Sequence, residues 1–315
     1  MISLVGYTGF VGSNILAGGH IDSVYNSSNI KDAYGTCPDL LIYAGMRAEK
    51  FLANNDPDRD LELARGAYDN IISIAPKKLV LISTIDVYGD PVGADETTKI
   101  DPSSASAYGR NRYCLEQWVR RSIDDALIIR LPGLFGMNIK KNFIYDLIHM
   151  IPSMLKADKF DELASEDDMI RNSYSLQSNG FYKLLTEYKD DPDLRSRFIL
   201  LGFTSLNFTD SRSTFQFYDL SRLYQDIMTA LDAGIKIFNP ATEPVSSGEL
   251  YRAVEGCGFD NKLAAGPVFY DYRTVYDSLF GGSRGYLTDK EDVICKVTEF
   301  VRSERGKISA DTYGQ

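Results

Sequence analysis

The 315-residue sequence predicts an α/β protein built on a doubly wound parallel sheet, and three observations carry this expectation. Short apolar strands alternate with helical stretches through the first half of the chain, which is the order of right-handed strand–helix–strand units. Residues 77–84 and 125–133 are almost continuously apolar, as expected of strands buried on both faces of a parallel sheet. Three glycines recur at a regular spacing over residues 6–12, between the first strand and the first helix.

Hydrophobic pattern and breaker residues place the individual elements. Strands are expected at 1–6, 22–27, 39–45, 77–84 and 125–133, and helices at 10–19, 56–75 and 105–122. Beyond about residue 137 the pattern changes to short amphipathic helices, such as 142–151 and 180–188, without regular strand spacing. Residues 215–218 and 235–240, with a helix between them, predict a return to the sheet, and a last helix is expected at 290–304. We therefore expect residues 1–136 and 215–240 to form the sheet domain, and 137–315 to form mainly a smaller domain interleaved with it.

Composition and charge argue against several classes of protein. The formal charge of −10 argues against non-specific nucleic-acid binding, which needs a basic surface. No apolar run reaches the ~18–20 residues of a membrane-spanning helix, and the N-terminus lacks the cationic region of a signal peptide, so we expect a soluble, cytoplasmic protein. The four cysteines and two histidines are scattered, whereas zinc sites cluster their ligands, so no metal centre is expected.

The glycine pattern GxxGxxG at Gly6, Gly9 and Gly12 is typical of a turn that binds a dinucleotide. Gly6 permits a tight turn, Gly9 lets backbone amides approach a pyrophosphate, and Gly12 lets the helix pack on the sheet. The start of the following helix offers N–H donors and a partial positive charge to phosphates. The same turn makes Thr8, Phe10 and Val11 candidate cofactor contacts. The alternative is an ordinary glycine-rich turn without a ligand.

The residues after the second strand bear on the choice of dinucleotide. Asn26, Ser27 and Ser28 stand where NAD-binding proteins usually carry an acid that accepts from the ribose 2′-hydroxyl. Asp32 falls beyond the predicted strand. This pattern favours NADP over NAD, although Asn and Ser are also ordinary turn residues.

Two further pairs of residues are candidates for a reaction centre. Ser83 and Thr84 end a buried strand, and strand ends are where an open parallel sheet presents its functional groups. Tyr108 and Arg112 are four residues apart in a predicted helix, so they share one face. They are either part of a reaction centre or the solvated first turn of an ordinary amphipathic helix.

Taken together, GxxGxxG, a hydroxyl residue three positions before Val87-Tyr88-Gly89, and Tyr-x-x-x-basic resemble the extended short-chain dehydrogenase/reductase family. This family comprises NAD(P)-dependent sugar epimerases and dehydratases on a Rossmann-type fold. Residues 127–136 resemble the sixth strand of that family and its following loop, and residues 212–220 and 235–254 resemble later segments more loosely. The resemblance spans about residues 1–255.

The resemblance implies roles for these residues. Thr84 would hydrogen-bond the reacting substrate oxygen, and Tyr108 would exchange its proton as a hydride moves to or from the nicotinamide. A phenol acting as a base near neutral pH needs its pKa lowered by about three units, or ~4 kcal/mol, and a cation at ~4 Å contributes about that much. Further cofactor contacts are expected, by the resemblance, at Ala44, Gly45, Ser83, Tyr108, Arg112, Leu131, Pro132 and Gly133.

Arg112 departs from the family, which has Lys at this position. Arginine keeps the charge, but its planar fork cannot occupy the place of a compact ammonium group. Two alternatives remain open at this point. The protein is an active enzyme with adjusted geometry, or a binding protein, such as a regulator or sensor, that kept the cofactor and lost the chemistry.

The substrate implied by the resemblance is a nucleotide sugar. Family dehydratases follow the Thr with an acid, whereas Ile85 stands here and cannot donate a proton, so epimerisation or ketone reduction ranks above dehydration. Asp86 is either a base or a loop cap. Arg212 and Asn142 are the candidates for binding the diphosphate. The resemblance also implies a homodimer that packs helices 57–75 and 105–122 against their copies. Leu115 and Trp118 would face that seam, or Trp118 would lie in the core instead.

Overall fold

The computed structural model describes residues 1–313 and divides the chain into two compact units. Unit 1 comprises residues 1–139, 214–245 and 269–293. Unit 2 comprises residues 140–213, 246–268 and the described chain from 294 onward. Each unit is therefore assembled from segments far apart in the sequence.

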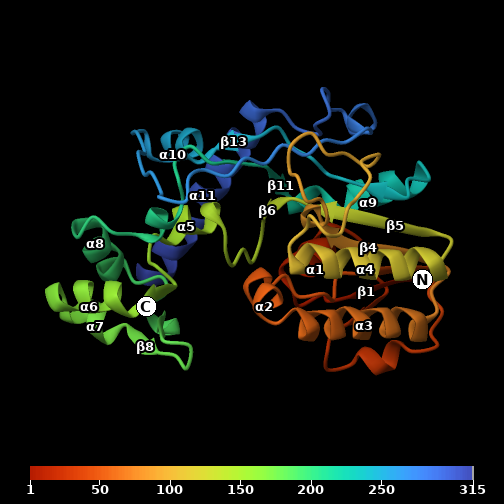
Figure 1. Ribbon diagram of the computed structural model, residues 1–315, viewed down its shortest axis with the longest axis horizontal. Coiled ribbons are helices and arrows are strands. Elements are labelled where there is room, and N and C mark those ends of the chain that lie inside the picture. Colours follow the sequence, from red (N-terminus) through yellow and green to blue (C-terminus); the bar gives the residue numbers. More distant parts are fainter. Residues whose placement is uncertain (314–315) are drawn as a thin grey trace. The chain divides into compact units, whose positions relative to one another are not determined.

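Unit 1 is built on a six-stranded sheet in the order β12-β5-β4-β3-β1-β2, and every neighbouring pair is parallel (Figure 1). The strands are β1 (Ile2–Val5), β2 (Ser23–Tyr25), β3 (Leu40–Tyr43), β4 (Lys78–Thr84), β5 (Ala126–Leu131) and β12 (Ile237–Phe238). The chain runs outward from β1 to β2 and then returns to β3 on the other side of β1. Open α/β sheets bind ligands at such a reversal, beyond the carboxyl ends of the strands. The predicted doubly wound, Rossmann-type sheet is confirmed.

Helices cover both faces of this sheet. Helices α1 (Phe10–Gly18) and α9 (Leu223–Asp232) bury apolar residues against one face, and α3 (Pro57–Ile74) and α4 (Ala107–Ser122) against the other. Along β4, Val80 belongs to the first core cluster, whereas Leu79 and Leu81 belong to the second. Alternate side chains thus enter opposite cores, which explains why this strand is apolar throughout.

Helix α4 corrects one expectation about the dimer. Leu115 is 1% exposed and lies in the core between α4 and the sheet, so it does not face a subunit seam. Trp118 is partly buried, with the Tyr68 ring 6.0 Å away and the Arg65 guanidinium 4.4 Å from its ring centroid.

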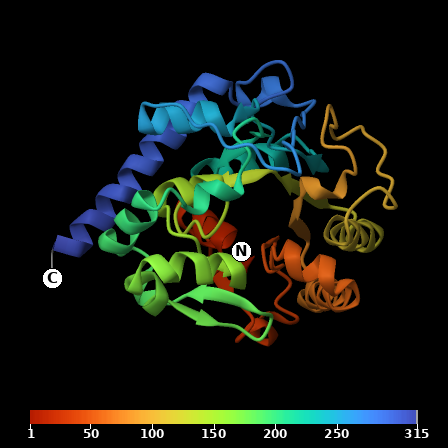
Figure 2. The same cartoon turned by 60° about the vertical axis from the view of Figure 1, so that its left-hand side comes forward.

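Unit 2 combines short helices with a three-stranded antiparallel sheet in the order β7-β9-β8. Its strands are β7 (Met154–Lys156), β8 (Tyr174–Leu176) and β9 (Phe181–Leu184), and its helices include α5 (Phe143–His149), α6 (Ala157–Glu166), α7 (Asp168–Asn172), α8 (Pro192–Leu200) and α10 (Ser247–Glu255). The expected helix at 180–188 is wrong, because its first half is the central strand β9. Tyr182 on this strand stacks on Phe160 of α6 at 3.7 Å, and Figure 2 shows α6 lying beside these strands. The apolar residues of this segment, whose spacing predicted a helix, therefore lie in a strand and pack against α6 instead.

The remaining elements are short, apart from the last helix. They are α2 (Lys50–Asn55), β6 (Gly133–Phe135) paired in parallel with β11 (Phe217–Asp219), β10 (Thr214–Phe215), β13 (Val245–Ser246) and α11 (Lys290–Tyr313). Among residues 1–313, no helix has the length and apolar character needed to cross a membrane.

Two glycine-to-alanine substitutions should have opposite effects on the free energy of unfolding. A Cβ on Gly12 would lie 2.1 Å from the Gly6 carbonyl oxygen, so Gly12→Ala should lower the free energy of unfolding by about 1–3 kcal/mol. Gly66 is an exposed α3 residue with open space around its Cα, so Gly66→Ala should raise it by about 0.5–1 kcal/mol. Urea denaturation of both variants tests this, and equal effects would contradict it.

Candidate functional site

The turn between β1 and α1 brings the backbone of two strands into close approach. Gly6 has φ +91°, and a Cβ there would lie 2.5 Å from the carbonyl oxygen of Ala44, just beyond β3. Gly9 is the N-cap of α1 and has no side chain with which to cap that helix. A glycine turn of this shape, followed by an uncapped helix N-terminus, fits the pyrophosphate of a dinucleotide. Thr8 is exposed in this turn, and Phe10 and Val11 begin the helix.

The residues after β2 form a closed turn. The Asn26 Oδ1 accepts hydrogen bonds from the Ser28 amide at 2.9 Å and the Ser28 hydroxyl at 2.6 Å, and exposed Ser27 lies between them. Asp32 lies further on, in a short 3₁₀ helix over Ile30–Ala33. No acid therefore follows β2 directly, in keeping with the sequence pattern.

The other predicted cofactor residues follow the ends of parallel strands as well. Ala44 and Gly45 follow β3, and Leu131 is the buried last residue of β5. Pro132 comes next, and Gly133 begins β6, where a Cβ would lie 2.6 Å from the Gln216 carbonyl oxygen. Parallel strands place these positions at one edge of the sheet.

Thr84 and Tyr108 belong to segments that pack tightly on each other. The Thr84 hydroxyl, at the end of β4, donates to the Asp86 carboxylate at 2.9 Å. A Cβ on Gly109 would lie 1.8 Å from the Asp86 carbonyl oxygen, so the first turn of α4 lies directly on the segment that follows Thr84. Tyr108, one residue before that glycine, is 5% exposed. The structure therefore brings Thr84, Asp86 and Tyr108 into one neighbourhood.

Arg112 is buried and its charge is balanced. It is 3% exposed, and both terminal nitrogens bind the Asp60 carboxylate of α3 at 3.1–3.2 Å. Nη2 also donates to the carbonyl oxygen of Arg47 at 2.7 Å. The guanidinium carbon lies 4.5 Å from the centroid of the Tyr108 ring, a cation–π contact. Arg112 therefore ties α4 to α3 and to the segment after β3.

The pKa of Tyr108 moves opposite to the expected direction. Burial raises the pKa of this phenol above its ordinary value, Arg112 acts to lower it, and Asp86 raises it further. The positive charge of Arg112 is shared with Asp60, so it does not overcome the loss of hydration that burial imposes on a phenolate. Arg112 thus acts on the pKa of Tyr108 in the expected direction, but burial has the larger effect.

Lys50 is a charged group that the sequence patterns did not single out. It begins α2, and its Nζ donates to the Asp86 carboxylate at 2.7 Å and lies 6.0 Å from the centroid of the Tyr108 ring. Burial acts to lower the pKa of Lys50, but Asp86 outweighs this and raises it. The only sequence signal is its position shortly after the end of β3.

A second buried ion pair lies beneath the site and was also missed. Arg130 of β5 and Glu116 of α4 are 1% and 0% exposed, and their ion pair measures 2.6 Å. The Ser83 hydroxyl donates to the same Glu116 carboxylate at 2.6 Å. The sequence did contain a sign of this pair, because Arg130 is the one charged residue in an otherwise apolar strand and a buried charge needs a partner. The predicted cofactor contact of Ser83 remains a prediction.

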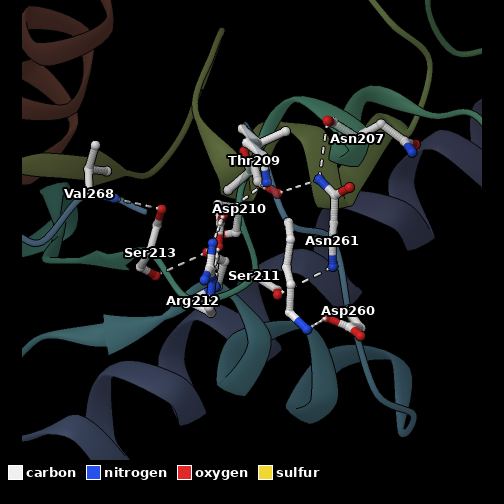
Figure 3. A network of polar contacts seen from close by, with 12 residues as sticks. Asn207, Thr209, Asp210, Ser211, Arg212, Ser213, Asp260, Asn261 and Val268 are labelled. Carbon is white, nitrogen blue, oxygen red and sulfur yellow. Dashed lines mark hydrogen bonds and ion pairs between the residues drawn. The ribbon is translucent and has the colours of Figure 1, made fainter. Parts of the chain in front are cut away.

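The two candidate substrate residues lie in unit 2. Arg212 binds the Asp210 carboxylate through Nε at 2.9 Å and Nη2 at 2.7 Å, and its side chain is 48% exposed (Figure 3). The Arg212 guanidinium holds the pKa of the Asp210 carboxyl well below its usual range. Asn142 caps α5, its Oδ1 accepting from the amides of Ile144 and Tyr145.

Removing one partner of the Arg112–Asp60 pair tests its importance for stability. Asp60→Asn should lower the free energy of unfolding by about 3–5 kcal/mol, because the buried guanidinium loses its counter-charge. Asp58→Asn is the matched control, since Asp58 lies exposed in the same first turn of α3. Denaturant titration of both variants measures the difference, and equal stabilities would show that the pair is not needed.

No family model matches the sequence, and no curated protein matches it. Solved structures match it along nearly its whole length. A dTDP-4-dehydrorhamnose reductase from Bacillus anthracis str. Ames, in complex with NADP, is 15% identical, covers 90% of this chain and 93% of its own, and has a TM-score of 0.58. A UDP-glucose 4-epimerase from Thermotoga maritima, with UDP-glucose, is 12% identical, with 98% and 99% covered and a TM-score of 0.58. A short-chain dehydrogenase/reductase superfamily protein from Agrobacterium tumefaciens, with bound NAD, is 15% identical, with 100% of both chains covered and a TM-score of 0.55. The chain therefore has the fold of these reductases and epimerases, which confirms at the level of the fold the resemblance carried by its motifs.

Proposed function

We propose that this protein is an NAD(P)-dependent oxidoreductase or epimerase that acts on a nucleotide sugar by hydride transfer. The observation that carries the proposal is the arrangement at the carboxyl edge of the unit 1 sheet. The glycine turn follows β1, and the Thr84 hydroxyl, with Tyr108 packed beside it, follows β4. Only β3 separates these two strands.

Each residue has a defined task in this proposal. The turn from Gly6 to Gly12 and the first turn of α1 bind the pyrophosphate. A bound nicotinamide supplies the group that accepts or donates a hydride. Thr84 donates a hydrogen bond to the reacting oxygen of the sugar, and Tyr108 moves the proton at that oxygen. Ile85 offers no acid for the loss of water, which favours epimerisation or reduction of a keto sugar over dehydration.

We assign the diphosphate of the substrate to Arg212. The bidentate contact with Asp210 orients the guanidinium and also offsets part of its charge. The assignment therefore rests on the resemblance and on the fit of a planar guanidinium to phosphate oxygens. We also propose that Asn142 contacts the substrate. This assignment is weaker than that of Arg212, because the side-chain oxygen of Asn142 already caps α5.

A second candidate is a non-catalytic dinucleotide-binding regulator. The balanced charge of Arg112 and the raised pKa of Tyr108 favour this alternative. Both candidates predict cofactor binding, and only the first predicts turnover.

Cofactor binding and turnover separate the two candidates. The purified protein should bind NADPH and oxidise it with a 4-keto nucleotide sugar, or should interconvert epimers with retained cofactor. Tyr108→Phe should reduce turnover by about 10²–10⁴-fold, because the phenol moves a proton. The Kd for NADPH should change far less, because Tyr108 is one of many expected cofactor contacts and the turn binds the phosphates. Tyr113→Phe, on the same helix, is the control. Tight NADPH binding without turnover on a panel of epimers and keto sugars would favour the regulator.

The closed turn at Asn26–Ser28 predicts a cofactor preference. NADPH should bind more tightly than NADH, because no carboxylate follows β2 to accept from the ribose 2′-hydroxyl or to repel a 2′-phosphate. Fluorescence titration with each nucleotide measures the two Kd values. An Asn26→Asp variant should shift the ratio of the two Kd values toward NADH, and tighter NADH binding by the unaltered protein would contradict the preference.

A further inference from the structure

Arg112, the positive charge one helical turn after Tyr108, is already paired with another group. Arg112 makes three buried contacts of 3.1–3.2 Å to Asp60 and a part-buried one to the Arg47 carbonyl oxygen. A buried guanidinium released from Asp60 would leave two charges unpaired, so this arrangement is stable. Any further adjustment of the charge around Tyr108 must come from another group.

Two charged groups other than Arg112 face Tyr108. Asp86, from the segment after β4, and Lys50, from α2, both act on the Tyr108 phenol, and they are joined by a 2.7 Å ion pair. The Lys50 side chain is 51% exposed, and that of Asp86 is 18% exposed. Tyr270 is a further titratable group that acts on Lys50. The unpaired Asp86 carboxylate would oppose ionisation of the phenol.

The contacts of Asp86 give the pair a place in the proposed reaction. One carboxylate oxygen accepts from Lys50 at 2.7 Å, and the other accepts from the Thr84 hydroxyl at 2.9 Å. Arg112 holds the Arg47 carbonyl oxygen, three residues before Lys50, so the buried ion pair also anchors the segment that carries this lysine.

We propose that Lys50 is a positioning residue of the reaction centre, which neutralises the Asp86 carboxylate beside Tyr108 and adds a second positive charge to that of Arg112. This inference rests on the proposed hydride-transfer function, in which Tyr108 moves a proton. It gives Lys50, a residue from a different helix, a share of the electrostatic task that the resemblance assigns to the residue four positions after the tyrosine.

The titration of Tyr108 tests this proposal independently of turnover. A fluorotyrosine with a more acidic phenol, incorporated at position 108 of the full chain, gives one ¹⁹F signal whose shift reports ionisation. Lys50→Met should raise the pKa of this phenol by about one unit, because the charge of Asp86 is exposed to it. Asp86→Asn should lower the pKa, the double variant should lie between the two, and Lys50→Arg should stay near the unaltered protein. Lys77→Met is the matched control. Lys77 lies just before β4 and forms an ion pair with Asp39 at 2.7 Å, the same distance as in the Lys50–Asp86 pair.

Opposite shifts for the two halves of one ion pair distinguish an electrostatic role from a structural one, since disrupted packing would move both variants the same way. An unmoved or lowered pKa in Lys50→Met overturns the proposal, even if the protein turns over nucleotide sugars. If the pKa of Tyr108 shifts as expected but the protein turns over no sugar, the electrostatic role of Lys50 is supported. The proposed function is then contradicted instead.

Discussion

The buried ion pair between Arg112 and Asp60 is the constraint on which the candidate site depends. It joins α4 to α3, and through the Arg47 carbonyl oxygen it also holds the segment that leads from β3 into α2. Tyr108 lies against the guanidinium, and Lys50 follows the tethered carbonyl by three residues. Desolvation makes such a pair costly to form and still more costly to break on one side. The positions of a phenol, a lysine and two helices are therefore linked through one contact.

Two close backbone approaches shape the same edge of the sheet. Gly6 lies against the Ala44 carbonyl, and Gly109 lies against the Asp86 carbonyl, so no side chain is tolerated at either glycine. The first approach creates a turn that fits a pyrophosphate, and the second sets the tyrosine helix on the strand end that carries Thr84. Steric exclusion at two glycines thus places a candidate phosphate-binding turn and a candidate proton-transfer pair along one edge.

Unit 2 holds its candidate anion-binding residue by a polar network instead. Asp210 fixes Arg212 and also accepts the amide of Leu263, while the Asn261 side chain donates to the carbonyl oxygens of Asn207 and Thr209 (Figure 3). These contacts join residues 207–213 to 260–263, two segments far apart in the chain. A guanidinium held in this way loses little conformational freedom when it binds an anion.

The sequence by itself determined the doubly wound sheet, the glycine turn and the hydroxyls at the end of β4, because these depend on local periodicity and on residues at fixed spacing. It also indicated Tyr108, whose helix and strand neighbours follow from the alternation of elements. Only the tertiary structure decided which charged side chains pair with one another. Asp60 neutralises Arg112, Glu116 pairs with Arg130, and Lys50 reaches Asp86, and in each pair the partners lie 14 to 52 positions apart. The central strand β9 was missed for a related reason, since its short apolar pattern fits a helix or a strand until Phe160 and the neighbouring strands are in place. Side-chain partners of this kind are chosen by packing in three dimensions, which spacing along the chain does not encode.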